Sequence, residues 1–105
     1  MTSLEDAKTT ATKYLQSLEE AHISVSEMYL FGSYSQNTQH EHSDIDVAVV
    51  SPDFGHCRPD ERVQLLVARG KSFLDIEPHP IGLNDFREND WDPFVKEVKK
   101  GIRII

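Results

Sequence analysis

A glycine–serine pair and an Asp-x-Asp pair are the residues of this sequence whose types and spacing could do chemistry. Gly32 and Ser33 follow an apolar run, ten residues intervene, and Asp44 and Asp46 then open a second apolar run. Gly32 permits a tight turn, and backbone N–H groups after it at a helix start can hold a phosphate. Alternate residues of a strand share one face, so we expect the two aspartates to project side by side.

These residues together suggest a site for a cation and a phosphate. Two carboxylates held close together repel each other, and a bound cation relieves that repulsion. Hard oxygen ligands on a rigid strand suit Mg²⁺. A phosphate-binding turn beside metal-binding carboxylates is the layout of phosphoryl or nucleotidyl transfer. The alternatives are that the aspartates only cap or face solvent at a strand start, and that Ser33 only caps a helix.

A third carboxylate is expected to complete the site. Two aspartates from one strand rarely fix the metals of nucleotidyl transfer, so a neighbouring strand should supply another ligand. Asp75 and Glu77 are the candidates, and strand periodicity puts both on one face. His79 lies nearby in the sequence. It is either a contact to a phosphate or an ordered water, or an ordinary loop histidine between two prolines.

The Gly32-Ser33 to Asp44-x-Asp46 spacing, set between two apolar strands, resembles the signature of the polymerase-beta-type nucleotidyltransferase superfamily. The short chain resembles its minimal nucleotidyltransferase (MNT) branch over the region from about Val25 to the C-terminus. One departure is Asn37, which stands where the family often has a second glycine; asparagine tolerates a left-handed backbone well. The segment around Glu77 resembles a third-strand segment of small family members, which favours Glu77 over Asp75 as third carboxylate.

The resemblance implies an enzyme that moves a nucleoside monophosphate, AMP from ATP, to an acceptor hydroxyl with Mg²⁺ as cofactor. Asp44, Asp46 and Glu77 would be the catalytic metal ligands, and Gly32 and Ser33 would bind the nucleotide triphosphate. The third carboxylate could also act as general base. MNT proteins are commonly encoded beside a HEPN-domain protein, and several are antitoxins that adenylylate a tyrosine of that HEPN toxin. A HEPN-type protein partner is therefore expected.

Composition narrows the classes of partner. The 105 residues predict a single domain, residues 1–105, without room for a separate substrate-binding domain. The net charge of −7 argues against nucleic acid as partner and favours a protein or small-molecule acceptor. The absence of a long apolar run, a basic leader and a second cysteine beside Cys57 predicts a cytoplasmic protein with no membrane partner. Whether the chain forms a homo-oligomer stays open.

Apolar periodicity and the placement of glycine and proline predict an α/β (α+β) fold, a small mixed β-sheet flanked by helices, which is also the minimal nucleotidyltransferase fold. A first helix should begin at Ser3 and end near His22, a second should run from Pro59 to Gly70, and a third from Asp92 to Gly101. The expected neighbouring strands are Val25–Phe31, Asp44–Ser51 and Phe73–Glu77, with residues 33–37 a short helix or turn. Ile102–Ile105 is either an edge strand or part of an interface.

Two other functions stay in view. A non-catalytic antitoxin or binding module would neutralise its partner by contact, but the intact set of acidic residues favours catalysis. A small-molecule nucleotidyltransferase, similar to aminoglycoside-modifying enzymes, would usually carry extra helices or a second domain that this chain lacks unless a partner provides them.

Overall fold

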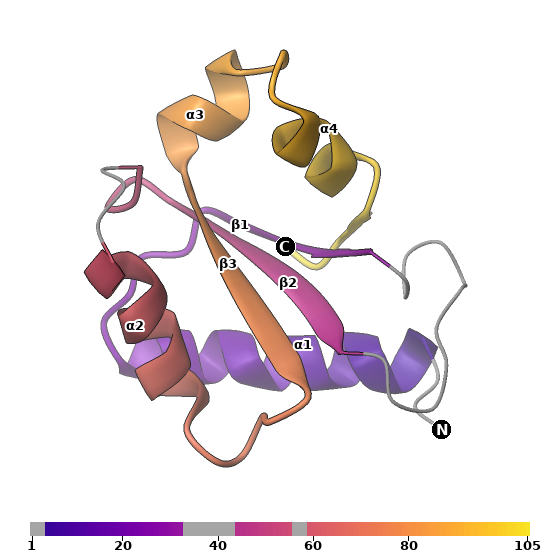
Figure 1. Cartoon of the computed structure of the whole chain (residues 1–105). Coiled ribbons are helices and arrows are strands. Elements are labelled where there is room, and N and C mark those ends of the chain that lie inside the picture. The colour runs from indigo at the N-terminus through magenta and orange to yellow at the C-terminus, as the bar shows by residue number, and fades with distance from the viewer. Residues whose placement is uncertain (1–3, 33–43, 56–58) are drawn as a thin grey trace.

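The computed structural model describes residues 4–32, 44–55 and 59–105, and these residues form four strands and four helices. The sheet order is β3-β2-β1-β4, with β2 and β3 parallel and the other neighbours antiparallel. The elements, in chain order, are α1 (Leu4–Glu20), β1 (Glu27–Phe31), β2 (Ile45–Ser51), α2 (Pro59–Arg69), β3 (Ile76–Gly82), α3 (Leu83–Glu88), α4 (Pro93–Lys99) and β4 (Ile102–Arg103). The expected α+β fold with a mixed sheet is confirmed, as is the adjacency of the three main strands (Figure 1).

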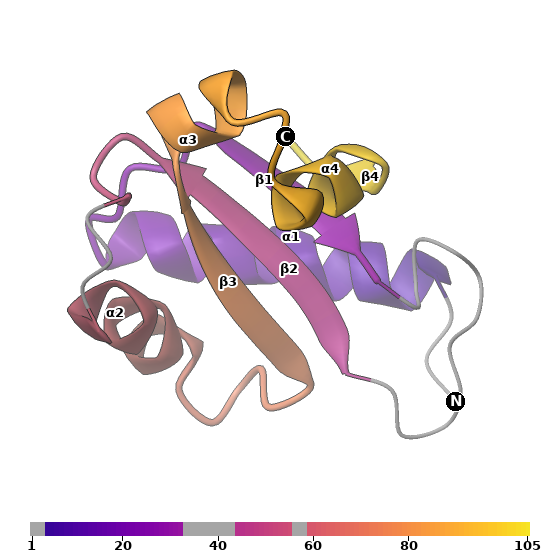
Figure 2. The same ribbon diagram turned by 45° about the horizontal axis from the view of Figure 1, so that its top comes forward.

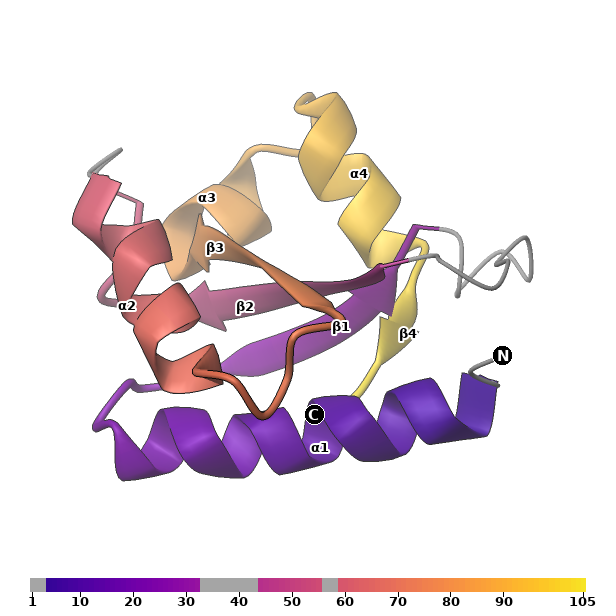
Figure 3. The same ribbon diagram turned by 60° about the horizontal axis from the view of Figure 1, so that its bottom comes forward.

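The helices form two layers, one on each face of the sheet. Figure 3 shows α1 on one side of the sheet and α3 and α4 on the other. The core on the α1 side is mainly aliphatic and includes residues of α1, α2 and the strands: Ala7, Ala11, Tyr14, Leu15, Leu18, Met28, Leu30, Ile45, Val47, Val49, Phe54, Leu65 and Ile76. The core on the α4 side comprises Phe31, Ala48, Val50, Ile81, Phe86, Val95 and Val98. Figure 2 shows β3, β2 and β1 side by side, with α4 over the β1 side of the sheet.

Helix boundaries follow the expected signals. Gly70 ends α2 with a φ of 56°, a left-handed conformation that glycine adopts at little cost. Asp92 caps α4, because its carboxylate accepts a hydrogen bond of 2.9 Å from the backbone N–H of Phe94. Pro93 occupies the first turn of α4, where its missing N–H costs nothing.

The third strand was predicted in the wrong place. It runs over Ile76–Gly82 rather than Phe73–Glu77, so it contains Pro78 and Pro80 instead of ending before them. Prolines are excluded from central strands because they lack a ladder donor, but an edge strand has one row of groups without a neighbour. The strand β3 is an edge strand of this sheet, which is why it accommodates both prolines.

The remaining differences are smaller. Helix α3 was not predicted, and α1 ends two residues before His22, which has a positive φ of 63°. The C-terminal segment does form an edge strand, β4, paired with β1. The expectations about Ser3, about a helix or turn over residues 33–37, and about Cys57 lie outside the described residues. Within the described part of the chain, no helix combines the length and apolar character that crossing a bilayer requires.

Candidate active site

The end of β1 meets the start of β2 at a glycine. Phe31 is the register partner of Asp46, and Gly32 follows with a φ of 76°. A Cβ built on Gly32 would lie 2.5 Å from Oδ2 of Asp46. Glycine is therefore required at position 32 for two reasons. The backbone has a left-handed conformation, and the Asp46 carboxylate leaves no space for a Cβ.

The parallel pairing of β2 and β3 brings two carboxylates together. Asp46 is the register partner of Glu77, and both side chains are half-buried. Partner residues of neighbouring strands point to the same face. That face is the one covered by α4, since the next inward residue of β2, Ala48, belongs to the core on the α4 side. The carboxylates thus stand at the edge of this core.

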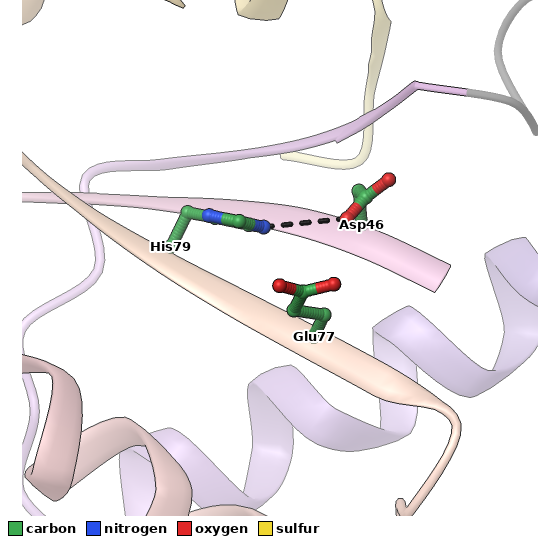
Figure 4. Close-up of side chains that lie close together, drawn as sticks. All are labelled: Asp46, Glu77 and His79. Carbon is green, nitrogen blue, oxygen red and sulfur yellow. Dashed lines mark hydrogen bonds and ion pairs between the residues drawn. The ribbon is translucent and has the colours of Figure 1, made fainter. Parts of the chain in front are cut away.

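His79 completes the cluster. Its Nε2 lies 3.3 Å from Oδ1 of Asp46, and Figure 4 shows the imidazole pointing along the sheet toward that carboxylate, with Glu77 beside both. His79 is the register partner of Ala48 of β2. The ring also contacts Phe31 and Phe94 edge-on, with centroids 5.2 Å and 5.7 Å away.

The cluster has the dimensions of a cation site. One ligand atom from each of Asp46, Glu77 and His79 lies within 4.8 Å of the others. Ligands of a divalent ion sit about 2.0–2.4 Å from it, which separates neighbouring ligand atoms by roughly 3–4.5 Å. The three side chains therefore fit a divalent cation with little adjustment, and two of the donors are the carboxylate oxygens that hard cations prefer.

Two other candidate ligands from the sequence, Asp44 and Asp75, are not among the three residues of this cluster. Asp44 precedes β2 and is exposed, and it is not part of the cluster. Asp75 is exposed in the turn before β3, where its backbone carbonyl accepts a 2.7 Å hydrogen bond from the N–H of Ile45. Ser33, the expected partner of Gly32 in binding phosphate, falls outside the described residues.

One basic side chain reaches the cluster from α2. Nη2 of Arg62 lies 3.4 Å from Oε1 of Glu77, and the two side chains are 52% and 41% exposed. An exposed pair of this kind contributes little to stability. Its effect is on the position of Glu77, whose carboxylate has a cationic partner on one side and Asp46 with His79 on the other.

The contact of His79 with Asp46 was not predicted from the sequence. The expectation that β3 ends at Glu77 placed the histidine in a loop, so its position was left open. The available signal was the alternation of Glu77 and His79 along an extended segment. The prolines at positions 78 and 80 obscure that signal, because proline is rare inside a strand.

Comparison with known proteins identifies the family of the chain. Residues 11–103 match the family model of the nucleotidyltransferase domain. The match spans most of the chain, and the protein belongs to this family. The resemblance inferred from the Gly-Ser and Asp-x-Asp spacing is therefore confirmed.

Individual relatives give a finer comparison. A segment of 26 residues is 69% identical to the protein adenylyltransferase MntA of Shewanella oneidensis, and covers 25% of this chain and only 19% of that protein. A crystal structure of a toxin-antitoxin with AMP-PNP is similar over 90% of this chain and 71% of that one, with 28% identity and a TM-score of 0.62. A mutant MntA-HpeT toxin-antitoxin is similar over the same shares, with 25% identity and a TM-score of 0.58.

Proposed function

We propose that this chain transfers AMP from ATP to a hydroxyl group of a protein partner, a tyrosine of a HEPN-type toxin, and thereby acts as an antitoxin. The observation that carries the proposal is the juxtaposition of Asp46 and Glu77 beside Gly32 in a chain of the nucleotidyltransferase family. The named relatives add support, because one is a protein adenylyltransferase and the others are toxin-antitoxin structures, one of them with AMP-PNP.

In the proposed reaction the acceptor oxygen attacks the α-phosphorus of ATP. The new bond joins that oxygen to phosphorus, the bond from the α-phosphorus to the bridging oxygen breaks, and pyrophosphate leaves. Asp46 and Glu77, with Asp44 two residues before Asp46, would hold the divalent cation, proposed to be Mg²⁺. When bound, it would neutralise charge on the phosphates and on the leaving group. Glu77 takes the proton from the acceptor hydroxyl as general base, and Gly32 with Ser33 binds the triphosphate.

The net negative charge of the chain supports a protein acceptor. The net charge of −7 disfavours binding to nucleic acid, because neutralising its phosphates requires basic residues. A partner protein would supply the acceptor hydroxyl and the walls of its binding site. The mutant MntA-HpeT structure carries glutamates in place of two aspartates two positions apart, the spacing of Asp44 and Asp46 in this chain.

The test is transfer of label to the product of the neighbouring gene. The full chain is incubated with Mg²⁺, the candidate partner and ATP labelled at the α-phosphate, and in a parallel reaction at the γ-phosphate. We expect the α-label on the partner and no γ-label. Asp46→Asn should abolish transfer, whereas Asp90→Asn, which changes an exposed aspartate paired with Lys99, should leave it intact.

Other results would contradict the proposal in distinct ways. Transfer of the γ-label would make the chain a kinase. Absence of label, combined with inhibition of the partner by both the native chain and Asp46→Asn, would make it an antitoxin that acts by contact. Labelling of a small hydroxyl compound in place of the protein would indicate a small-molecule nucleotidyltransferase.

A further inference from the structure

The donor set beside Glu77 differs from a purely acidic cage, because it contains an imidazole. Nε2 of His79 is 3.3 Å from Oδ1 of Asp46. Two atoms bound to one ion at about 2.1 Å lie roughly 3.0 Å apart at a right angle and 3.4 Å apart at a tetrahedral angle. The observed separation falls between these values, so both atoms can bind one cation without a change of rotamer.

The position of the imidazole is constrained on several sides. Its side chain is 23% exposed, and its ring packs edge-on against Phe31 of β1 and Phe94 of α4. The backbone that carries it is stiffened by Pro78 and Pro80, each with a fixed φ. A ligand held in this way loses little conformational freedom when an ion binds, which favours coordination.

We propose that His79 is a direct nitrogen ligand of the cation bound at Asp46 and Glu77, so that the site binds transition-metal ions such as Co²⁺ or Mn²⁺ more tightly than Mg²⁺, the ion proposed above for the reaction. Imidazole nitrogen is a good ligand for transition-metal ions and a poor one for Mg²⁺, which takes oxygen ligands and keeps its waters. The inference rests on the proposed cation site and adds to it the class of ion that the site selects.

A role for His79 as a simple hydrogen-bond partner of Asp46 leads to a different expectation. In that case the imidazole would orient the carboxylate, and any side chain able to donate the same hydrogen bond would replace it. The affinity for every divalent ion would then change by the same factor. Ion selectivity therefore separates a direct ligand from a positioning residue.

The experiment measures binding of metal ions alone to the full chain. Co²⁺ is titrated by calorimetry and by its visible absorption, and Mg²⁺ by its competition with Mn²⁺ observed by electron paramagnetic resonance. The variants are His79→Gln, which keeps a hydrogen-bond donor, and His79→Phe, which keeps an aromatic ring between Phe31 and Phe94. Unfolding of each variant by urea checks that the fold is retained.

We expect both variants to lose at least about tenfold in Co²⁺ affinity, the smaller end of the loss seen even for residues that only support a metal ligand. Their Mg²⁺ affinity should change by less than about threefold, because nitrogen contributes little to Mg²⁺ binding. The native chain with Zn²⁺ should also show a shift of the His79 Nε2 resonance in ¹⁵N spectra.

Equal losses for Co²⁺ and Mg²⁺, or no loss in His79→Gln, would overturn the proposal that His79 is a ligand. The variant Glu77→Gln shows whether only the role of His79 is wrong or whether the proposed cation site is wrong too. If Glu77→Gln lowers the affinity for both ions while the histidine variants lower neither affinity, the proposed cation site is retained and the inference about His79 is wrong. If Glu77→Gln also leaves both affinities unchanged, the proposed cation site is wrong as well.

Discussion

The two faces of the sheet use the same strands for different purposes. On β2, Ile45, Val47 and Val49 enter the core beneath α1, whereas Ala48 and Val50 enter the core beneath α4. The α1 face is filled mainly by aliphatic side chains, with the rings of Tyr14 and Phe54 among them. The α4 face begins with Asp46 and the cluster around it, and only then becomes apolar. Alternation along one strand thus separates the residues that stabilise the fold from those assigned to chemistry.

This separation predicts that a substitution in the core on the α1 side lowers the free energy of unfolding without changing the cluster of Asp46, Glu77 and His79. Leu18 is fully buried in this core, and Leu18→Ala should lower the free energy of unfolding by about 2–5 kcal/mol. Leu74 is 64% exposed, so Leu74→Ala should cost less than about 0.5 kcal/mol and serves as the matched control. Urea denaturation measures both. A large loss of Co²⁺ affinity in folded Leu18→Ala would show that the two faces are coupled.

Substitutions in the cluster on the α4 face should have the opposite effect and lower activity rather than stability. Glu77→Gln should lower the rate of AMP transfer by at least about a hundredfold, as expected for a metal ligand or general base, with the free energy of unfolding little changed. Asp75→Asn removes an exposed carboxylate before β3 and should cost about tenfold or less, because it only alters the local field. Single-turnover rates decide between them. If Asp75→Asn is inactive and Glu77→Gln is active, Asp75 and not Glu77 is the third carboxylate.

Substitution of Gly32 should lower both stability and cation affinity, and substitution of Gly70 shows which loss comes from the backbone alone. Gly32→Ala places a methyl group 2.5 Å from Oδ2 of Asp46, so the carboxylate must move and the cation affinity should fall about tenfold or more. Gly70 has a similar positive φ, but a Cβ there meets nothing nearer than 3.9 Å. Each substitution should cost about 1–2 kcal/mol of stability through its backbone. If Gly70→Ala loses cation affinity to the same extent, backbone strain explains the effect and displacement of Asp46 does not.

The smallest expected change in stability comes from loss of a hydrogen bond in the core on the α1 side. The buried hydroxyl of Tyr14 donates a 2.7 Å hydrogen bond to the carbonyl of Leu65, and Tyr14→Phe should cost about 0.5–1.5 kcal/mol near pH 7. Burial raises the pKa of the Tyr14 phenol above its ordinary value, an effect that Arg69 partly offsets.

The sign of the pH dependence follows from that direction. A raised pKa in the folded state favours the folded, protonated form. The contribution of Tyr14 is therefore fully present below the unfolded pKa of about 10 and is lost as the pH rises above it. The stability gap between the native chain and Tyr14→Phe should narrow above about pH 10 in urea unfolding at matched ionic strength. A gap that stays constant with pH would mean that Tyr14 ionises equally well in both states.

Much of this architecture could be predicted from local sequence signals. Gly32, Asp44 and Asp46 stand out by spacing, and proline and glycine mark the ends of α2. The position of β3 could not be predicted in this way, because its prolines are compatible with a strand only at the edge of a sheet, and edge position is a property of the whole fold. The contact between His79 and Asp46 follows from the register of β3, so it was missed together with that strand.

The prolines of β3 also decide how a second protein can approach the carboxylates. A proline in a paired strand turns the side that lacks an N–H away from the ladder. The outer rim of β3 therefore has too few donors at Pro78 and Pro80 to accept an added strand, a protection against edge-to-edge association that sheets commonly need. The backbone rim beside Glu77 is closed to β-augmentation. The partner proposed above would therefore be recognised at this site through side chains and not through strand pairing.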